Sequence, residues 1–170
     1  MERISSFMKV SKDNFVSAIT DEFKDIDAAR ASEIYDNLKL PVRGTAGSAG
    51  YDFKIPVNLT LKPGETAKIP TGIRSRMENG WVRMVFPRSG LGFKYRLQLN
   101  NTVGIIDSDY FNSDNEGHIF IKITNDSNEG KVLELKEGDG FAQGIFLPFG
   151  LTLDDECTAD RNGGFGSTGA

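Results

Sequence analysis

The chain has 170 residues, of which 38% are hydrophobic and 26% are charged, proportions typical of one soluble globular domain (residues 1–170). Its formal net charge of -4 at pH 7 argues against a nucleic-acid-binding surface, which is normally basic. No secretory signal and no membrane-length apolar run is visible, so we expect a cytoplasmic protein with no nucleic-acid or membrane partner.

The first forty residues predict a short strand over residues 3–10 and two helices. Ser11 is a suitable helix cap, and one apolar stripe follows it at spacings of four, four and three: Phe15, Ile19, Phe23 and Ile26. A second short helix is predicted over residues 28–38. We expect this helical segment, residues 11–38, to pack on the domain surface; a contact with a protein partner or another subunit is the alternative.

From Tyr51 onward the sequence predicts an all-β fold, either a sandwich or a jelly-roll-like barrel. Six segments rich in β-branched and aromatic residues are interpreted as strands: 52–61, 66–69, 81–86, 118–124, 132–135 and 141–148. No helical period longer than two turns appears after residue 41. The last ten residues, 161–170, hold four glycines and little to bury, so we expect a mobile arm.

Two internal strings carry candidate chemistry. Pro87-Arg88-Ser89-Gly90 follows a predicted strand and offers a guanidinium, a hydroxyl and turn amides, which suits a phosphate group, although a solvated surface turn is the alternative. Asp107 follows two isoleucines, so its carboxylate could be partly desolvated and orient a water as general base; a turn aspartate bonding its own backbone is the alternative. Tyr110 could fill the core or present its ring to a sugar.

The tail and the scarcity of histidine and cysteine also bear on the function. Glycines around Phe165 leave its ring able to stack on a flat base, with Ser167 and Thr168 within reach of phosphates; a tail without function is the alternative. His118 and Cys157 are the only residues of their types, which argues against zinc ligand sets and Ser-His-Asp triads. A polyphosphate ligand with a flat ring would use all three strings, so we predict a nucleotide-processing enzyme.

Over residues 41–170 the chain resembles the homotrimeric-type dUTP diphosphatase (dUTPase) family. Five strings carry this resemblance in the family's order: Ala49 to Phe53, Pro87 to Leu91, Asn101 to Tyr110, Gly138 to Gln143, and the tail from Arg161. The resemblance implies a distorted jelly-roll-like barrel and hydrolysis of dUTP to dUMP and pyrophosphate, which limits uracil in DNA and supplies dUMP for thymidylate synthesis. It also implies a homotrimer with shared active sites, and Mg²⁺ bound mainly through the triphosphate oxygens.

The resemblance implies a role for each matching residue. Asp107 would orient the water that attacks the α-phosphorus, and Asp52 would lie near the metal's water shell. The phosphates would be held by Arg88, Ser89, Gly90 and Gln143. The segment from Asn101 to Tyr110 would form a hairpin that reads uracil mainly through its backbone and rejects a ribose with the tyrosine ring, using Asn101, Gly104, Ile106 and Tyr110. The tail would close over the substrate through Arg161, Phe165, Gly166, Ser167 and Thr168.

The chain departs from the family pattern at four places. Residues 111–115 intervene after Tyr110, Gly140 replaces a basic residue, Arg161 lies one residue closer to Phe165 than usual, and residues 11–38 are an addition. Three other functions compete with dUTP hydrolysis. A sister-fold dCTP deaminase would need a catalytic glutamate in place of the aspartate–tyrosine pair. A nucleotide-gated binding protein would use the added helices on a partner, and a structural β-protein would not require Phe165.

Overall fold

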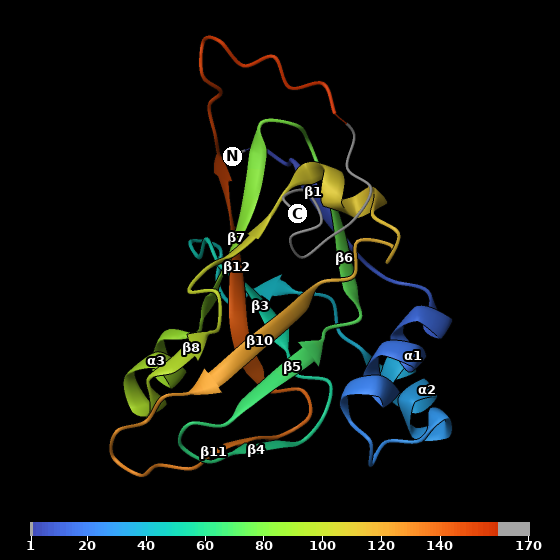
Figure 1. The fold of residues 1–170 in the computed structure, drawn as a ribbon, viewed down its shortest axis with the longest axis vertical. Coiled ribbons are helices and arrows are strands. Elements are labelled where there is room, and N and C mark those ends of the chain that lie inside the picture. The colour runs from blue at the N-terminus through green and yellow to red at the C-terminus, as the bar shows by residue number, and fades with distance from the viewer. Residues whose placement is uncertain (1, 160–170) are drawn as a thin grey trace.

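The strands of the chain form four sheets in the computed structural model, which describes residues 2–159 (Figure 1). A two-stranded sheet contains β1 (Ser5–Lys9) and β6 (Ile73–Met77). A three-stranded sheet contains, in order, β5 (Thr66–Pro70), β10 (Phe120–Asn125) and β8 (Leu97–Leu99). A second pair contains β11 (Leu133–Leu135) and β4 (Leu59–Leu61). The five-stranded sheet has the order β2 (Val42–Arg43), β3 (Tyr51–Lys54), β12 (Gly140–Pro148), β7 (Trp81–Pro87) and β9 (Gly104–Ile106).

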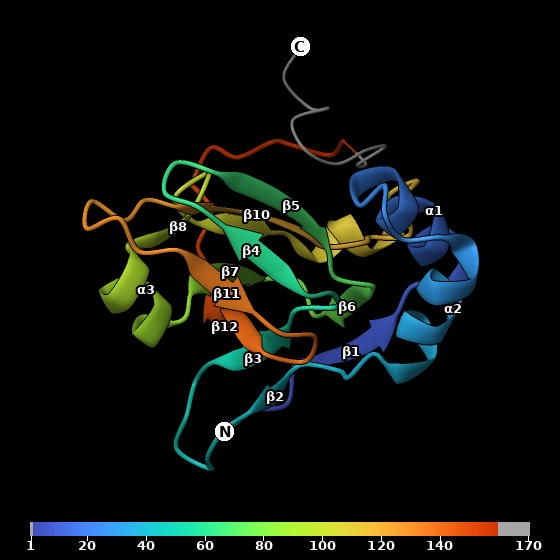
Figure 2. The ribbon, with the colours of Figure 1, turned by 90° about the horizontal axis from the view of Figure 1, so that it is seen from below.

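The core lies between the three-stranded and five-stranded sheets, which face each other in Figure 2. Burial follows the period of two that a half-buried strand requires. In β10, Ile121 and Ile123 are buried while the intervening Lys122 is exposed. The opposite sheet contributes Phe53, Val85 and Phe141 to the same hydrophobic cluster. The predicted β-rich architecture is therefore present.

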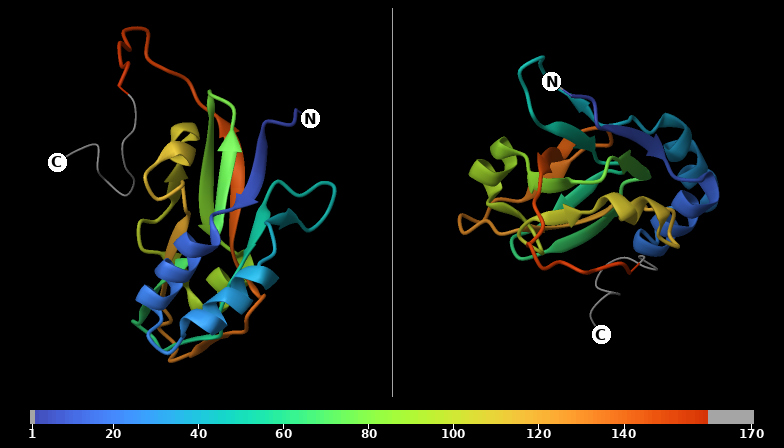
Figure 3. Two further views of the ribbon diagram at one scale, coloured as in Figure 1. Left: turned by 90° about the vertical axis from the view of Figure 1, so that its right-hand side faces the viewer. Right: turned by 90° about the horizontal axis from the view of Figure 1, so that it is seen from above.

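Two helices occupy the N-terminal segment, α1 (Lys12–Glu22) and α2 (Ala28–Asn37). The Ser11 side chain accepts a hydrogen bond from the Asn14 backbone amide at 3.3 Å, as a helix cap should. Phe15 and Ile19 are buried in the shared core, and the α2 residues Ala31 and Ile34 join them. The pair covers one side of the sheets (Figure 3), so the segment packs onto the rest of the chain through one apolar face. None of the helices in residues 2–159 is long and apolar enough to cross a membrane.

Several elements differ from the sequence prediction. The single strand predicted over residues 52–61 is two strands, because Pro56 cannot donate a ladder hydrogen bond and the chain leaves the sheet there. The strand expected from residue 118 begins at Phe120. The prediction missed β2, β6, β8, β9, the helix α3 (Ser89–Tyr95) and the 3₁₀ turn η1 (Ser108–Asn112). The helix α3 buries none of its residues and contains two glycines, so its sequence carries no apolar period.

A cation lies inside the core. Arg83 on β7 is fully buried, and its guanidinium lies over the rings of Phe7, Phe53 and Phe146. It donates to the Ser75 hydroxyl, and burial lowers its pKa to about 9. A lone buried guanidinium is costly unless it is paired or fully hydrogen-bonded, and cation–π contacts offset part of that cost.

His118 joins α1 to the sheets in its neutral form. Its Nε2 accepts from the Gly72 amide at 2.8 Å, so Nδ1 carries the proton and donates to Asn14 Oδ1 at 2.8 Å. Burial lowers the pKa of His118 to about 4 from its ordinary value of 6.5.

We expect the free energy of unfolding to fall as the pH is lowered from 6.5 to 4. In that window the unfolded chain protonates His118 while the folded chain does not, so acid favours unfolding, by up to about 3 kcal/mol. Denaturant unfolding across this window, compared with the His118→Gln variant, measures the effect. Equal pH dependence in the two proteins would contradict the assignment.

Candidate active site

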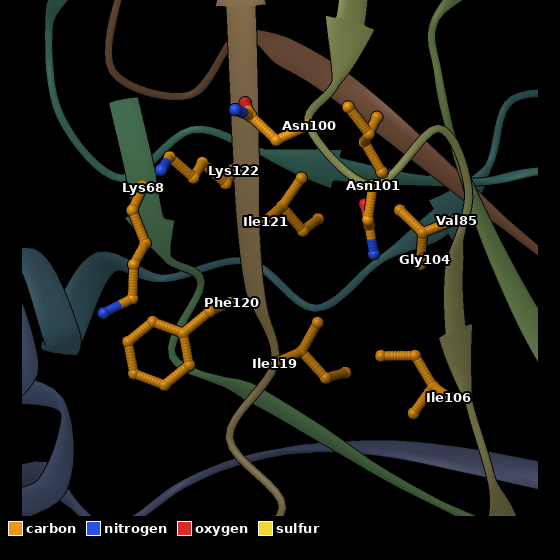
Figure 4. A pocket seen from close by; sticks show the side chains of 11 residues that line it. Lys68, Val85, Asn100, Asn101, Gly104, Ile106, Ile119, Phe120, Ile121 and Lys122 are labelled. Atoms are coloured by element: carbon orange, nitrogen blue, oxygen red, sulfur yellow. The ribbon is translucent and has the colours of Figure 1, made fainter. Parts of the chain in front are cut away.

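A pocket opens where the chain passes from one sheet to the other. The strands β8 and β9 flank residues 100–103, yet β8 pairs with β10 and β9 pairs with β7, so each is the edge strand of a different sheet. The two strands diverge around a cavity of about 230 Å³. Figure 4 shows residues that line it, among them isoleucines in or next to β10 and the aliphatic Val85. Three others, Asn101, Gly104 and Ile106, belong to one motif and are predicted from the sequence to bind the substrate.

The pocket suits one small flat ring. Its volume is below the roughly 300–1,000 Å³ typical of drug-sized sites, and its walls are mainly apolar. Gly104 permits the close approach of β9 to β7, since an added Cβ would lie 3.2 Å from Val85 Cβ. An edge strand presents backbone N–H and C=O groups on its outer side. A ring entering the pocket therefore meets apolar walls, an asparagine and backbone donors and acceptors.

Asp107 follows β9 directly. It is half-buried, its backbone is extended, and it caps η1, with its carbonyl accepting from the Tyr110 amide at 3.3 Å. Tyr110 lies in the core, and its hydroxyl donates to the His118 carbonyl at 2.6 Å. The structure therefore places the carboxylate next to the pocket in sequence and fixes the hydroxyl end of the tyrosine inside the protein.

A polar cluster forms where β3, β12 and β7 meet. Gln143 lies opposite Asp52 in β3 and opposite Phe86 in β7, and its amide donates to the Pro87 carbonyl at 3.1 Å. Arg88 Nε lies 3.2 Å from Asp52 Oδ1, forming an ion pair. Arg88, Ser89 and Gly90 are exposed at the start of α3. The four predicted phosphate-binding residues and Asp52 thus share one region.

Glycines in two of the motifs make room for this cluster. A Cβ on Gly50 would lie 2.5 Å from Gln143 Oε1. A Cβ on Gly140 would lie 2.5 Å from Arg88 Nη1, so the Arg88 side chain occupies the space that a side chain at residue 140 would need. The family pattern usually has a basic residue at that position. The ion pair between Arg88 and Asp52 uses the space that Gly140 leaves.

Asp107 and the polar cluster lie far apart within one chain. Val85 pairs with Gly104 in antiparallel register, and Arg88 and Asp107 lie three residues beyond that pair in opposite directions. Both have extended backbones, so at about 3.3 Å per residue they are separated by roughly 20 Å. In Figure 1, α3 accordingly lies at the lower left, and η1, the yellow coil, lies in the upper part of the molecule.

The cluster offers little to a metal ion by itself. No group of three or more histidine, cysteine, aspartate or glutamate residues in the described part of the chain could hold one. Asp52 contributes one carboxylate, already paired with Arg88. Such a donor set fits Mg²⁺ only where substrate oxygens and waters provide most of its ligands.

The predicted tail residues lie outside the described part of the chain: Arg161, Phe165, Gly166, Ser167 and Thr168. Among described residues, the sequence prediction missed the pocket floor, formed by Val85, Leu99, Ile119 and Ile121. These are ordinary apolar strand residues, and only the three-dimensional pairing brings them under the hairpin. The prediction also missed Asn115, considered below.

A dUTPase family model matches residues 36–169. The chain belongs to the dUTPase family. The deoxyuridine 5'-triphosphate nucleotidohydrolase of Lactococcus lactis subsp. lactis (strain IL1403) is 43% identical over 136 residues, which cover 78% of this chain and 89% of the relative. The protein of that name from Shewanella baltica (strain OS155 / ATCC BAA-1091) is 40% identical over 157 residues, 87% of this chain and 95% of the relative.

Solved dUTPase structures share the fold. The crystal structure of the Streptococcus mutans dUTPase is 41% identical with a TM-score of 0.60, covering 69% of this chain and 90% of its own. The dUTPase of Staphylococcus bacteriophage 80alpha, solved with dUPNHPP, has a TM-score of 0.61 at 21% identity, over 99% of this chain and 100% of its own. The prediction of a hydrolase of the dUTPase type is confirmed.

The predicted role of Gln143 in phosphate binding implies that Gly50→Ala raises the KM for dUTP by roughly tenfold, because the new methyl group would displace the Gln143 side-chain amide. Gly47→Ala is the matched control from the same loop, since nothing lies within 4 Å of its added Cβ. Steady-state kinetics on both variants provide the comparison. Equal KM values would remove Gln143 from substrate binding.

Proposed function

We propose that the chain hydrolyses dUTP to dUMP and pyrophosphate, acting as one dUTPase-like domain in a homotrimer whose subunits share each active site. The observation that carries the proposal is the pocket between β8 and β9, sized for one ring and followed directly by the Asp107 carboxylate. Membership of the dUTPase family supports dUTP as the substrate of this pocket. We interpret the facing sheets as the distorted jelly-roll-like barrel of this family.

The pocket would bind the uracil ring. Uracil presents two carbonyl oxygens and one N–H on its edge, which complement the backbone groups of Gly104 and Ile106 and the amide of Asn101. The apolar floor excludes water from the ring faces. Tyr110 would border the deoxyribose and crowd out a 2'-hydroxyl, because its ring is fixed by the hydrogen bond to His118.

The phosphates would be bound by Arg88, Ser89, Gly90 and Gln143 of a second subunit. The roughly 20 Å between Arg88 and Asp107 in one chain supports this division, since a triphosphate bound beside Asp107 would not reach its own chain's cluster. Exposed apolar side chains also support assembly: Phe93 on α3 is 92% exposed, and Leu151 and Leu153 are exposed in the segment after β12. The tail from Arg161 would close over the substrate of another subunit.

Chemistry would proceed without a covalent enzyme intermediate. Asp107 would accept a proton from a water while the oxygen of that water bonds to the α-phosphorus. The bond from the α-phosphorus to the oxygen shared with the β-phosphorus would break, releasing pyrophosphate. Arg88 and the hydroxyl of Ser89 would stabilise the charge on the departing phosphates. When bound, Mg²⁺ would neutralise the triphosphate through its oxygens, with Asp52 near its water shell.

We expect Asp107→Asn to retain dUTP binding and lose turnover by roughly 10²- to 10⁴-fold, because asparagine cannot accept the proton. Product analysis with dUTP, dCTP, dTTP and UTP in the presence of Mg²⁺ should show pyrophosphate from dUTP alone for the native chain. Ammonia from dCTP would indicate the deaminase instead. Unchanged turnover in the variant would remove Asp107 from the mechanism.

The shared site predicts complementation between inactive variants. Arg88→Ala and Asp107→Asn chains, unfolded and refolded together, should regain up to about one quarter of native turnover, since random mixing gives that share of sites both native groups. Arg88→Ala mixed with Ser89→Ala is the matched control, because both changes fall in one chain's cluster and no mixed site is complete. No recovery in confirmed mixed oligomers would contradict a site built across subunits.

A further inference from the structure

The start of α1 is tied to the loop after η1. The Ser11 amide donates to Glu116 Oε2 at 2.7 Å, and the Ser11 hydroxyl donates to Glu116 Oε1. The Asn14 side-chain amide donates to the Asn115 carbonyl at 3.2 Å and accepts from His118 Nδ1 at 2.8 Å. Ser11 and Asn14, which we call the α1 clamp, therefore hold residues 115–118 through four hydrogen bonds. Figure 2 shows α1 beside this part of the chain.

The clamped loop is pressed against the backbone of Tyr110. Glu116 and Gly117 both have positive φ, 62° and 68°. A Cβ on Gly117 would lie 2.7 Å from the Tyr110 carbonyl oxygen and 2.7 Å from Phe111 Cα, so the turn fits only with glycine there. Because the loop has no free space on that side, a shift of the loop would be passed to residues 110 and 111.

The same loop fixes the Tyr110 hydroxyl. Asn115 Nδ2 donates to Tyr110 Oη at 2.9 Å, and that hydroxyl donates to the His118 carbonyl at 2.6 Å. Asn115 also donates to the His118 carbonyl at 3.3 Å, and its Oδ1 accepts from the Gly117 amide at 3.1 Å. One asparagine thus joins the loop turn to the ring. In a site that excludes a single hydroxyl group, a displacement of about 0.5 Å in that ring is enough to weaken the discrimination between deoxyribose and ribose.

We propose that Asn14 and Asn115 are positioning residues for sugar discrimination: the α1 clamp fixes the loop, and Asn115 fixes the Tyr110 ring against which the deoxyribose packs. This inference rests on the proposed function and extends that function by giving the N-terminal helical segment a part in substrate specificity. The family match begins at residue 36, so the clamp comes from a part of the chain outside the matched region. The loop it holds, residues 115–118, overlaps the end of residues 111–115, where the sequence also departs from the family pattern.

The experiment measures kcat/KM for dUTP and for UTP in the native chain, in Asn14→Ala and in Asn115→Ala. We expect the dUTP-to-UTP ratio to fall by roughly tenfold in each variant, because Asn115→Ala removes a hydrogen bond that holds the ring and Asn14→Ala removes two that hold the loop carrying Asn115. Ser17→Ala, an exposed position on the same helix, is the matched control and should keep the native ratio. If Asn14→Ala does not fold, Asn14→Gln keeps the amide and moves it by one methylene.

A double-mutant cycle tests the route through the hydroxyl. Tyr110→Phe removes the group that Asn115 holds, so Asn115→Ala should change the ratio less in that background than in the native chain. Additive effects on the ratio would show that Asn115 acts elsewhere and would overturn this route.

Loss of stability alone would look different. It would lower activity toward dUTP and UTP by the same factor and reduce the thermal unfolding temperature. If the variants behave in that way, with native ratios, the clamp is structural only and the inference is wrong. A native chain that does not hydrolyse dUTP would instead overturn the proposed function, which separates the two failures.

Discussion

The site depends on the pairing of β8 and β9 with different sheets. In an ordinary hairpin the two strands would lie about 4.8 Å apart and bond to each other, leaving no room for a ring between them. Here β10 and β7 draw them apart, and the apolar residues under the hairpin become the floor of a pocket. The backbone groups that a hairpin would consume internally stay on strand edges, where a ligand can bind them.

That pairing also separates the charges. The antiparallel register of β7 and β9 sends the chain toward Arg88 at one end and toward Asp107 at the other. Asp52, which does lie near Arg88, forms an ion pair with it at 3.2 Å. Distance within the chain keeps Asp107 from an ion pair with the Arg88 of the same chain.

The sequence predicts the parts of the structure that depend on local patterns. The helix α1 follows from a serine cap and an apolar stripe, and the residues of the polar cluster belong to motifs visible in the sequence. The strands β8 and β9 have three residues each, too few to show a period, and α3 has no buried face. The strand β6 alternates too, with Ile73, Ser75 and Met77 buried and an arginine between each pair, but two charges in five residues obscure the pattern in the sequence. Contacts such as Gln143 over Gly50 join distant residues and leave no local trace.

The N-terminal helices and the loop after η1 contact each other through polar groups. The loop that contains residues 111–115 ends in polar groups that need partners, and Glu116 finds them at the start of α1, where the Ser11 hydroxyl and amide lower the pKa of its carboxyl. A carboxylate at a helix N-terminus is also favoured by the helix dipole. Without the helix, Glu116 and the His118 ring would lose these partners, and without the loop the α1 N-terminus would lose its anion. The N-terminal helices and the loop therefore act as one structural unit placed against Tyr110.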